Sequence, residues 1–191
     1  MKYDSVSAGA GGQGALVVSA AIAMRSGLFV KQLEEHGMAQ RGGSVVSHVS
    51  LSDRPVFSSI IPHGRADLIV SMEPLEAPRY LPCLALRGTL LSSSEPVRNF
   101  PSYPDLDDIV GEIRALPESH LVDAQQLARD AGLARASNLV MVGAASAFLS
   151  LESSEIEAAV REGFASRGET VVEANLATFR AGREAVACVP A

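Results

Sequence analysis

A glycine-rich loop near the amino end constrains the fold of this chain more than any other feature. Tyr3–Ala8 has the pattern of a strand, and Ala15–Arg25 is rich in helix formers. A loop with glycines at positions 9, 11 and 14 joins them. Leu28–Leu33 fits a second strand. The sequence therefore predicts a β-α-β unit with a right-handed crossover, in which these two strands pair in parallel.

The rest of the chain continues to alternate strands with helices. Apolar residues alternate along Ser44–Leu51, Ser52–Pro55 has turn residues, and Val56–Ile61 returns, which predicts an inserted hairpin. A long surface connection is expected over Ser94–Pro104, which holds three prolines. Further strands are expected at Ala66–Met72, Gly88–Ser93 and Ser119–Val122, and helices at Leu106–Ala115 and Ala124–Ala131 and from Glu73, Asn138, Ser154 and Glu169. The predicted fold class is α/β: a three-layer sandwich with a mostly parallel sheet, an inserted β-hairpin, and C-terminal helices, with helices on both faces.

Length and composition indicate one domain over residues 1–191 and argue against several classes of protein. Charged residues make up 20% of the chain and apolar residues 47%, so part of the surface is expected to be an interface. The net charge of -6 argues against a nucleic-acid or anionic-membrane partner. No secretory signal is visible, so a cytoplasmic location is expected.

The longest uncharged run, Asn138–Leu151, is too short to cross a bilayer and is expected to be a buried helix. Its Gly143–Ala147 core consists of small residues, which would let another backbone approach closely. Replacing Ala145 by leucine is predicted to overpack this site at a cost of about 1–3 kcal/mol.

Cysteine and histidine spacing indicates no metal centre. Cys83 and Cys188 are far apart and belong to no Cys-x-x-Cys motif, so any iron–sulfur cluster is expected to belong to another chain. The histidines show no metal-ligand spacing. His48 is expected to be a hydrogen-bonded structural residue of its strand and His63 part of a turn, while His120 precedes an apolar strand without evident partners.

Glu73 ends a buried strand beside a proline, where it could be a site carboxylate or a favourable charge at a helix N-terminus. The helix role is favoured. Pro78 lies within the same predicted helix and could kink it.

The glycine loop itself permits three interpretations. Gly9, Gly11 and Gly14 match the dinucleotide-binding spacing, and Glu34 stands where a ribose-binding acid would be, which leaves an NAD site open. The amides of the loop could instead hold a phosphate or carboxylate. Alternatively, Gly11 and Gly14 only let helix and strand pack closely. The candidate anion-binding residues are Gly9, Gly11, Gly12, Gln13 and Gly14.

A second polar segment follows the second predicted strand. It combines a histidine, an amide and a permanent cation with three glycines, which suits contact with a polar or anionic group. Its expected position is the carboxyl edge of the sheet, where open α/β sheets bind ligands. A well-ordered turn, with Arg41 paired to Glu34 or Glu35, is the alternative. The candidate site residues are Glu34, His36, Met38, Gln40, Arg41, Gly42 and Gly43.

Two stretches carry a resemblance to a known family. HGMAQRGGSVVSHV, from His36 to Val49, follows the glycine loop by about twenty residues, and EPLEAPRYL runs from Glu73 to Leu81. They resemble the gamma subunit, or gamma domain, of the 2-oxoacid:ferredoxin oxidoreductases, which include pyruvate, 2-oxoglutarate, branched-chain and indolepyruvate types. The resemblance covers most of the chain. It implies a Rossmann-like fold that is not a nicotinamide site.

The resemblance also implies partners and cofactors. Enzymes of this class oxidatively decarboxylate a 2-oxoacid with coenzyme A and pass electrons to ferredoxin, using thiamine diphosphate, Mg²⁺ and [4Fe-4S] clusters. The chain would bind none of these cofactors alone, would contribute no catalytic residue and would be inactive in isolation. Its partners would be the alpha, beta and delta (ferredoxin-like) subunits, with the Glu34–Gly43 segment presented to the catalytic subunits. An isolated chain could form a homodimer.

Other functions remain open at this point. The main alternative is a free-standing nucleotide-binding or regulatory module of Rossmann-like fold, and the third is an NAD-linked reductase. Within the resembled class, the identity of the 2-oxoacid is also open.

Overall fold

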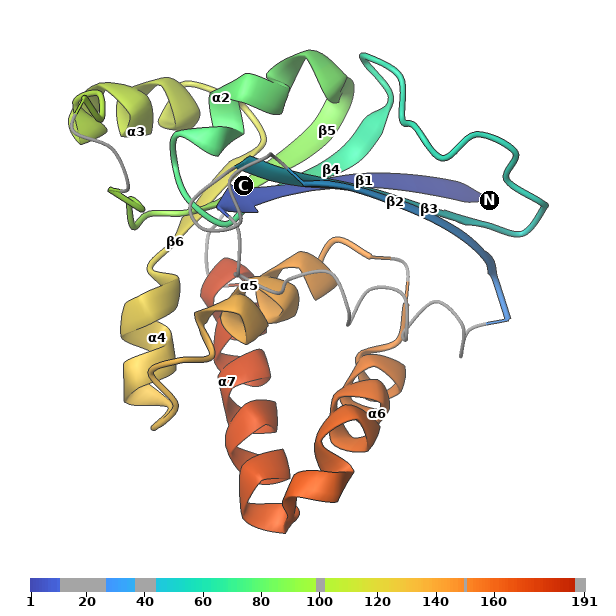
Figure 1. Ribbon diagram of the computed structural model, residues 1–191, viewed down its shortest axis with the longest axis vertical. Coiled ribbons are helices and arrows are strands. Elements are labelled where there is room, and N and C mark those ends of the chain that lie inside the picture. Colours follow the sequence, from blue (N-terminus) through green and yellow to red (C-terminus); the bar gives the residue numbers. More distant parts are fainter. Residues whose placement is uncertain (11–26, 37–43, 99–101, 150, 188–191) are drawn as a thin grey trace.

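The structure is a computed structural model that describes residues 1–10, 27–36, 44–98, 102–149 and 151–187. Its strands form one six-stranded sheet in the order β2-β3-β1-β4-β5-β6 (Figure 1). The pairs β1–β4, β4–β5 and β5–β6 are parallel, whereas β3 is antiparallel to both β1 and β2. The strands are β1 (Lys2–Ala10), β2 (Phe29–His36), β3 (Ser44–Ser52), β4 (Ala66–Ser71), β5 (Leu84–Ser93) and β6 (Ser119–Val122).

Two details of the predicted strand pairing are wrong. β1 and β2 run in the same direction but do not pair, because β3 lies between them. The antiparallel partners of β3 are β1 and β2 rather than Val56–Ile61, which forms no strand. Since β1 and β2 occupy both edges of β3, no ladder edge is left for that segment.

Helices cover both faces of the sheet, as predicted (Figure 1). On one face lie α2 and α3, and on the other lie α4, α5, α6 and α7. The predicted helix over 15–25 lies outside the described residues. The helices are α2 (Glu76–Tyr80), α3 (Leu106–Arg114), α4 (Ala124–Asp130), α5 (Ser137–Ser146), α6 (Ser153–Phe164) and α7 (Glu169–Ala187), with short 3₁₀ turns η1 (Leu81–Cys83) and η2 (Ala165–Arg167).

Strand β4 shows why the sheet is buried on both faces. Ile69 packs with the cluster under α2 and α3, while Leu68 and Val70, on the opposite side of the pleat, pack with α5. All three side chains are at most 5% exposed. A separate cluster within the helical layer joins α5, α6 and α7 around Phe179, which is fully buried.

Local capping places the helices after the strands that precede them. The Asp105 carboxylate accepts a hydrogen bond from the Asp107 amide at 2.9 Å, and Asp123 accepts one from Gln126 at 2.9 Å. The chain leaves α4 through Gly132, which has a φ of +81°. Each described helix is too short or too polar to span a bilayer.

Helices α5 and α7 touch through their backbones at two glycines. A Cβ on Gly143 would lie 1.9 Å from the Phe179 carbonyl oxygen, and one on Gly182 would lie 1.9 Å from that of Val140. The predicted close approach therefore exists, and Gly182 is a partner that sequence reasoning missed. Ala145 is half-buried and lines a small cavity of about 30 Å³. We accordingly expect leucine at Ala145 to cost less than any side chain at Gly143.

Candidate functional site

The carboxyl edge of the sheet gathers the two polar segments that the sequence singled out. Gly9, near the end of β1, and His36, the end of β2, both lie beside Val45 of β3. The glycine loop and the segment after His36 therefore leave the sheet from strands on either side of the beginning of β3. This is the edge at which open α/β sheets bind ligands.

The structure describes three of the candidate site residues. Gly9 is buried in β1, and His36 is the last residue of β2. Glu34 is an exposed residue of β2 whose Oε1 accepts a hydrogen bond from the side-chain Nε2 of Gln32 at 2.9 Å. Predictions for the remaining candidates lie outside the described residues: Gly11, Gly12, Gln13, Gly14, Met38, Gln40, Arg41, Gly42 and Gly43.

The position of Glu34 weakens the dinucleotide interpretation. A ribose-binding acid follows the strand next to the glycine loop strand in the Rossmann arrangement. Here β3 separates β2 from β1, which places their axes roughly 10 Å apart, two strand spacings. Glu34 therefore does not occupy the position of a ribose-binding acid in an NAD site.

A polar cluster that sequence reasoning missed lies where β3 begins. The Ser44 hydroxyl donates to Glu76 Oε2 at 2.7 Å and lies 3.5 Å from the Tyr80 hydroxyl. Arg79 forms an ion pair with Glu76 at 3.4 Å. Glu76 is 7% exposed, and a buried carboxylate needs hydrogen-bond and charge partners of this kind. The cluster fixes α2 to the residue at which the segment 37–43 re-enters the sheet.

Glu73 holds the connection that follows β5. Its Oε2 accepts a hydrogen bond from the Tyr103 hydroxyl at 2.7 Å and a longer one from the Val97 amide at 3.5 Å. The pKa of the Tyr103 hydroxyl is raised, first by burial and to a smaller extent by this hydrogen bond to Glu73. These contacts give the Glu73 carboxylate a structural role in holding the connection, and its favoured role as a charge at the helix N-terminus stays a prediction. Glu73 is 3% exposed, and its carboxylate joins the end of β4 to the connection after β5.

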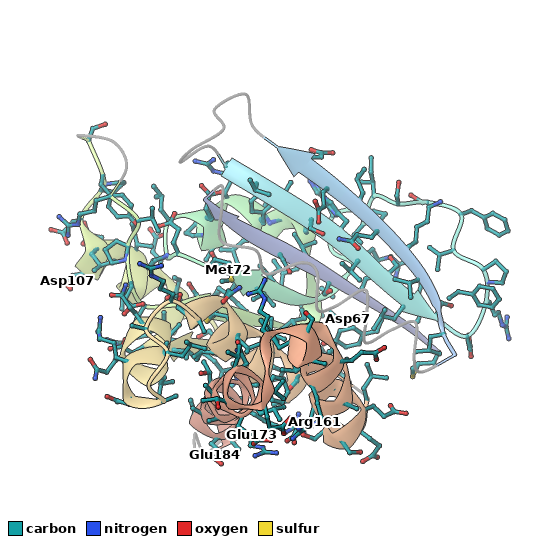
Figure 2. All side chains as sticks on the ribbon, turned by 60° about the horizontal axis from the view of Figure 1, so that its bottom comes forward. Asp67, Met72, Asp107, Arg161, Glu173 and Glu184 are labelled. Atoms are coloured by element: carbon teal, nitrogen blue, oxygen red, sulfur yellow. The ribbon has the colours of Figure 1, made fainter. Side chains whose placement is uncertain are left out.

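A small polar hollow of about 80 Å³ lies further along the same edge. Met72, which directly follows β4, lines it between the sheet and the helical layer (Figure 2). Glu95 also lines it and accepts a hydrogen bond from the Gln125 amide at 3.0 Å. Burial, and then a hydrogen bond with Asp123, raises the pKa of Glu95. The carboxyl groups of Glu95 and Asp123 therefore lie together on the side of β5 and β6.

Three histidines, His48, His63 and His120, have structural surroundings. His48 is 8% exposed, and its Nδ1 accepts a hydrogen bond from the Ile61 amide at 3.3 Å, which confirms its predicted role. His63 lies in the predicted turn, beside Gly64 with its φ of +69°. The His120 ring packs 5.0 Å from the ring of Phe148.

Acidification should loosen the segment that follows β3. Burial lowers the pKa of His48, and the charge of Glu35 partly opposes this shift. The unfolded chain takes up this proton near pH 6.5, so the stabilisation is complete above that pH and is lost as the pH falls through the lower folded value. We expect the hydrogen-exchange protection factor of the Ile61 amide to fall between pH 7.5 and 5.5. An equal fall in His48→Gln would contradict this origin.

The described residues contain no group of three histidine, cysteine, aspartate or glutamate side chains placed to hold a metal ion. Cys83 is buried, and burial raises the pKa of its thiol. At the carboxyl edge, the buried carboxylate of Glu73 bonds the connection after β5, and that of Glu76 bonds Ser44 at the start of β3.

The fold and this edge define an α/β protein of Rossmann-like type with an antiparallel pair beside a parallel sheet. Residues 5–185 match the pyruvate ferredoxin/flavodoxin oxidoreductase family. The chain belongs to the gamma-subunit family of the 2-oxoacid:ferredoxin oxidoreductases. It is thus a subunit of a ferredoxin-dependent oxidoreductase, as the resemblance implied.

Similar proteins of known name cover nearly the whole chain. Indolepyruvate oxidoreductase subunit IorB of Archaeoglobus fulgidus is 38% identical over 95% of this chain and 94% of its own length. The IorB subunit of Methanothermobacter thermautotrophicus is 36% identical over 98% and 99%.

Solved structures share the fold. The gamma subunit of a keto/oxoacid ferredoxin oxidoreductase from Geobacter sulfurreducens has a TM-score of 0.71 at 25% identity, covering 98% of this chain and 97% of that one. A 2-oxoglutarate:ferredoxin oxidoreductase from Magnetococcus marinus, solved with 2-oxoglutarate, coenzyme A and succinyl-CoA, has a TM-score of 0.76 at 19% identity. The match covers 99% of this chain and 32% of that polypeptide.

Proposed function

We propose that this chain is the gamma-type subunit of an indolepyruvate:ferredoxin oxidoreductase. One observation carries the proposal: relatives named as indolepyruvate oxidoreductase subunits match this chain over nearly the full length of both aligned sequences. The same full-length match supports a single gamma-type domain over residues 1–191. The reaction converts the 2-oxoacid and coenzyme A to acyl-CoA and CO₂, and two electrons pass to ferredoxin.

The cofactors of that reaction belong, in this proposal, to the partner chains. A [4Fe-4S] cluster takes four cysteine thiolates, and this chain has two cysteines, of which Cys83 is buried. Its residues do not fit a cluster. Thiamine diphosphate, Mg²⁺ and the clusters are therefore assigned to alpha-, beta- and delta-type partners, and coenzyme A is a substrate of the assembled enzyme.

The role of this chain is to present loops to those partners. The segment from Glu34 to Gly43 and the glycine loop Gly9–Gly14 leave the sheet at one edge, on strands that flank β3. The cluster of Ser44 and Glu76 fixes the point at which the first segment returns. We infer that the segment contacts the catalytic subunits and that the glycine loop amides can hold an anion.

Arg41→Ala should separate this role from a structural one. An exposed ion pair on a glycine-hinged loop contributes about 0–1 kcal/mol to stability, whereas a guanidinium that a partner removes from water contributes more. We expect the variant to keep the melting temperature of the isolated chain and to lower 2-oxoacid-dependent ferredoxin reduction at least tenfold. Loss of stability in the isolated chain with normal turnover would identify a structural turn instead.

The substrate assignment is tested by competition among 2-oxoacids. The chain is assembled with the thiamine-binding chain encoded in the same genome, and coenzyme A-dependent ferredoxin reduction is followed. We expect kcat/KM for indolepyruvate to exceed the values for pyruvate and 2-oxoglutarate at least tenfold. A preference for either of the latter would overturn the indolepyruvate assignment while leaving the subunit assignment in place.

A further inference from the structure

The exposed large hydrophobic side chains of the described residues all lie at the amino edge of the sheet, opposite the candidate site. This edge consists of the amino ends of β1, β2, β4 and β5, the carboxyl end of β3, and the connection 53–65 between β3 and β4, here called the arm. In Figure 1 the arm extends beyond the sheet near the N-terminus. The exposed side chains are Met1, Phe29, Phe57, Ile60 and Leu86.

The arm has two exposed hydrophobic side chains on a segment that is anchored at both ends. Phe57 is 93% exposed and Ile60 is 57% exposed. The next residue, Ile61, is 2% exposed and bonded to His48. At the far end, the Gly64 amide donates to the Pro82 carbonyl at 2.8 Å. An aromatic side chain held outside the core on an anchored segment can bind a partner with little further loss of conformational entropy.

Two further exposed apolar side chains lie on other strands of this edge. Phe29, which is 50% exposed, is in register with Ser52 at the end of β3, which in turn pairs with Lys2. Leu86, fully exposed, stands in the irregular part of the β4–β5 pairing. Exposed apolar side chains gathered at one edge of a protein are a feature of interaction sites.

The rim of this surface is basic, although the chain as a whole is acidic with a net charge of -6. Asp53, an exposed acid in the arm, is paired with the N-terminal amine. A second copy docked face to face would bring two basic rims together, whereas an acidic partner surface would be attracted. The exposed basic residues of the rim are Lys31, Arg54, Arg65 and Arg87, together with Lys2, whose ammonium is paired with Asp4.

We propose that the amino edge, with Phe57 and Ile60 at its centre, docks an acidic, apolar-centred surface of the thiamine-binding partner chain. This inference rests on the proposed function. The surface is distinct from the contact of the candidate site, because nine-residue strands separate the two edges by roughly 30 Å. The amino edge attaches the subunit to the complex, and the carboxyl edge presents its loops to the catalytic subunits.

The test is a titration of the thiamine-binding chain with the double variant Phe57→Ser/Ile60→Ser. Both side chains are exposed, so the melting temperature of the isolated chain should change little. We expect the dissociation constant to rise about thirtyfold or more, as for loss of a hot spot, while activity at saturating subunit stays at the wild-type value. Phe57→Leu/Ile60→Val keeps the apolar surface and should stay within about threefold, as should Glu155→Gln on α6.

Each other outcome contradicts the inference. Equal binding of wild type and double variant would overturn the docking surface and leave the proposed function intact. Absence of binding by the wild type would overturn both. A wild-type homodimer that the double variant dissociates, seen by sedimentation without any change in binding of the thiamine-binding chain, would assign the edge to a second copy instead.

Discussion

Gly143→Ala should destabilise the protein by about 3 kcal/mol, lowering its melting temperature by roughly 6–12 °C. The added methyl group would lie 1.9 Å from the Phe179 carbonyl oxygen and 2.8 Å from its carbonyl carbon. Both atoms belong to the backbone of α7, so no side-chain rotation relieves the clash. The two helices must separate, which opens the fully buried cluster around Phe179. Thermal or urea unfolding of the isolated chain measures the effect.

Gly111→Ala is the matched control for this prediction. Gly111 lies in α3 and a Cβ there meets nothing within 4 Å. The same substitution should therefore be neutral or stabilising by up to about 1 kcal/mol, because alanine favours the helix over glycine. If both variants unfold alike, the contact between α5 and α7 is looser than the structure describes.

Glu73→Ala should cost about 2 kcal/mol, the second largest effect that the structure predicts. The substitution removes the acceptor of the Tyr103 hydroxyl and leaves a cavity at a position that is 3% exposed. Tyr103→Phe removes the donor and should cost about 1 kcal/mol. Since the two variants break one shared bond, the double variant should cost less than their sum.

A double-mutant cycle by urea unfolding decides whether the hydrogen bond between Tyr103 and Glu73 stabilises the protein. Strict additivity would mean that Glu73 and Tyr103 contribute independently. Proteolysis within 94–104 reports the same event locally, because the connection should become more susceptible when either partner is lost. If both variants resist this proteolysis as well as the wild type does, contacts other than the bond between Glu73 and Tyr103 stabilise the connection.

The regular elements could be predicted from sequence because their signals are local. The apolar run of β4 and the capping aspartate before α3 lie within the segments that they define. β6 was predicted to the residue as Ser119–Val122. The strand order could not be read in this way, since the pairing of β3 with β1 depends on which edges are free rather than on the residues of β3.

The site was harder to predict because its contacts join distant residues. Ser44 and Glu76 are 32 positions apart, and Glu73 and Tyr103 are 30 apart. Glu73, Tyr80 and Ser44 stood in stretches that carried the family resemblance, but nothing in the sequence paired Ser44 with Tyr80 or Glu73 with Tyr103. The Glu34–Gly43 segment was marked by composition, and its position follows from the ends of β2 and β3. Its residue roles stay predictions.

The central claim is that this chain completes a 2-oxoacid:ferredoxin oxidoreductase by binding a thiamine-containing partner. The most direct measurement adds the purified chain back to that partner, prepared without it, and follows indolepyruvate- and coenzyme A-dependent ferredoxin reduction. We expect activity to rise at least tenfold from a low baseline and to saturate at one chain per partner active site. Full activity of the partner alone, or no rise on adding a folded chain, would contradict the account.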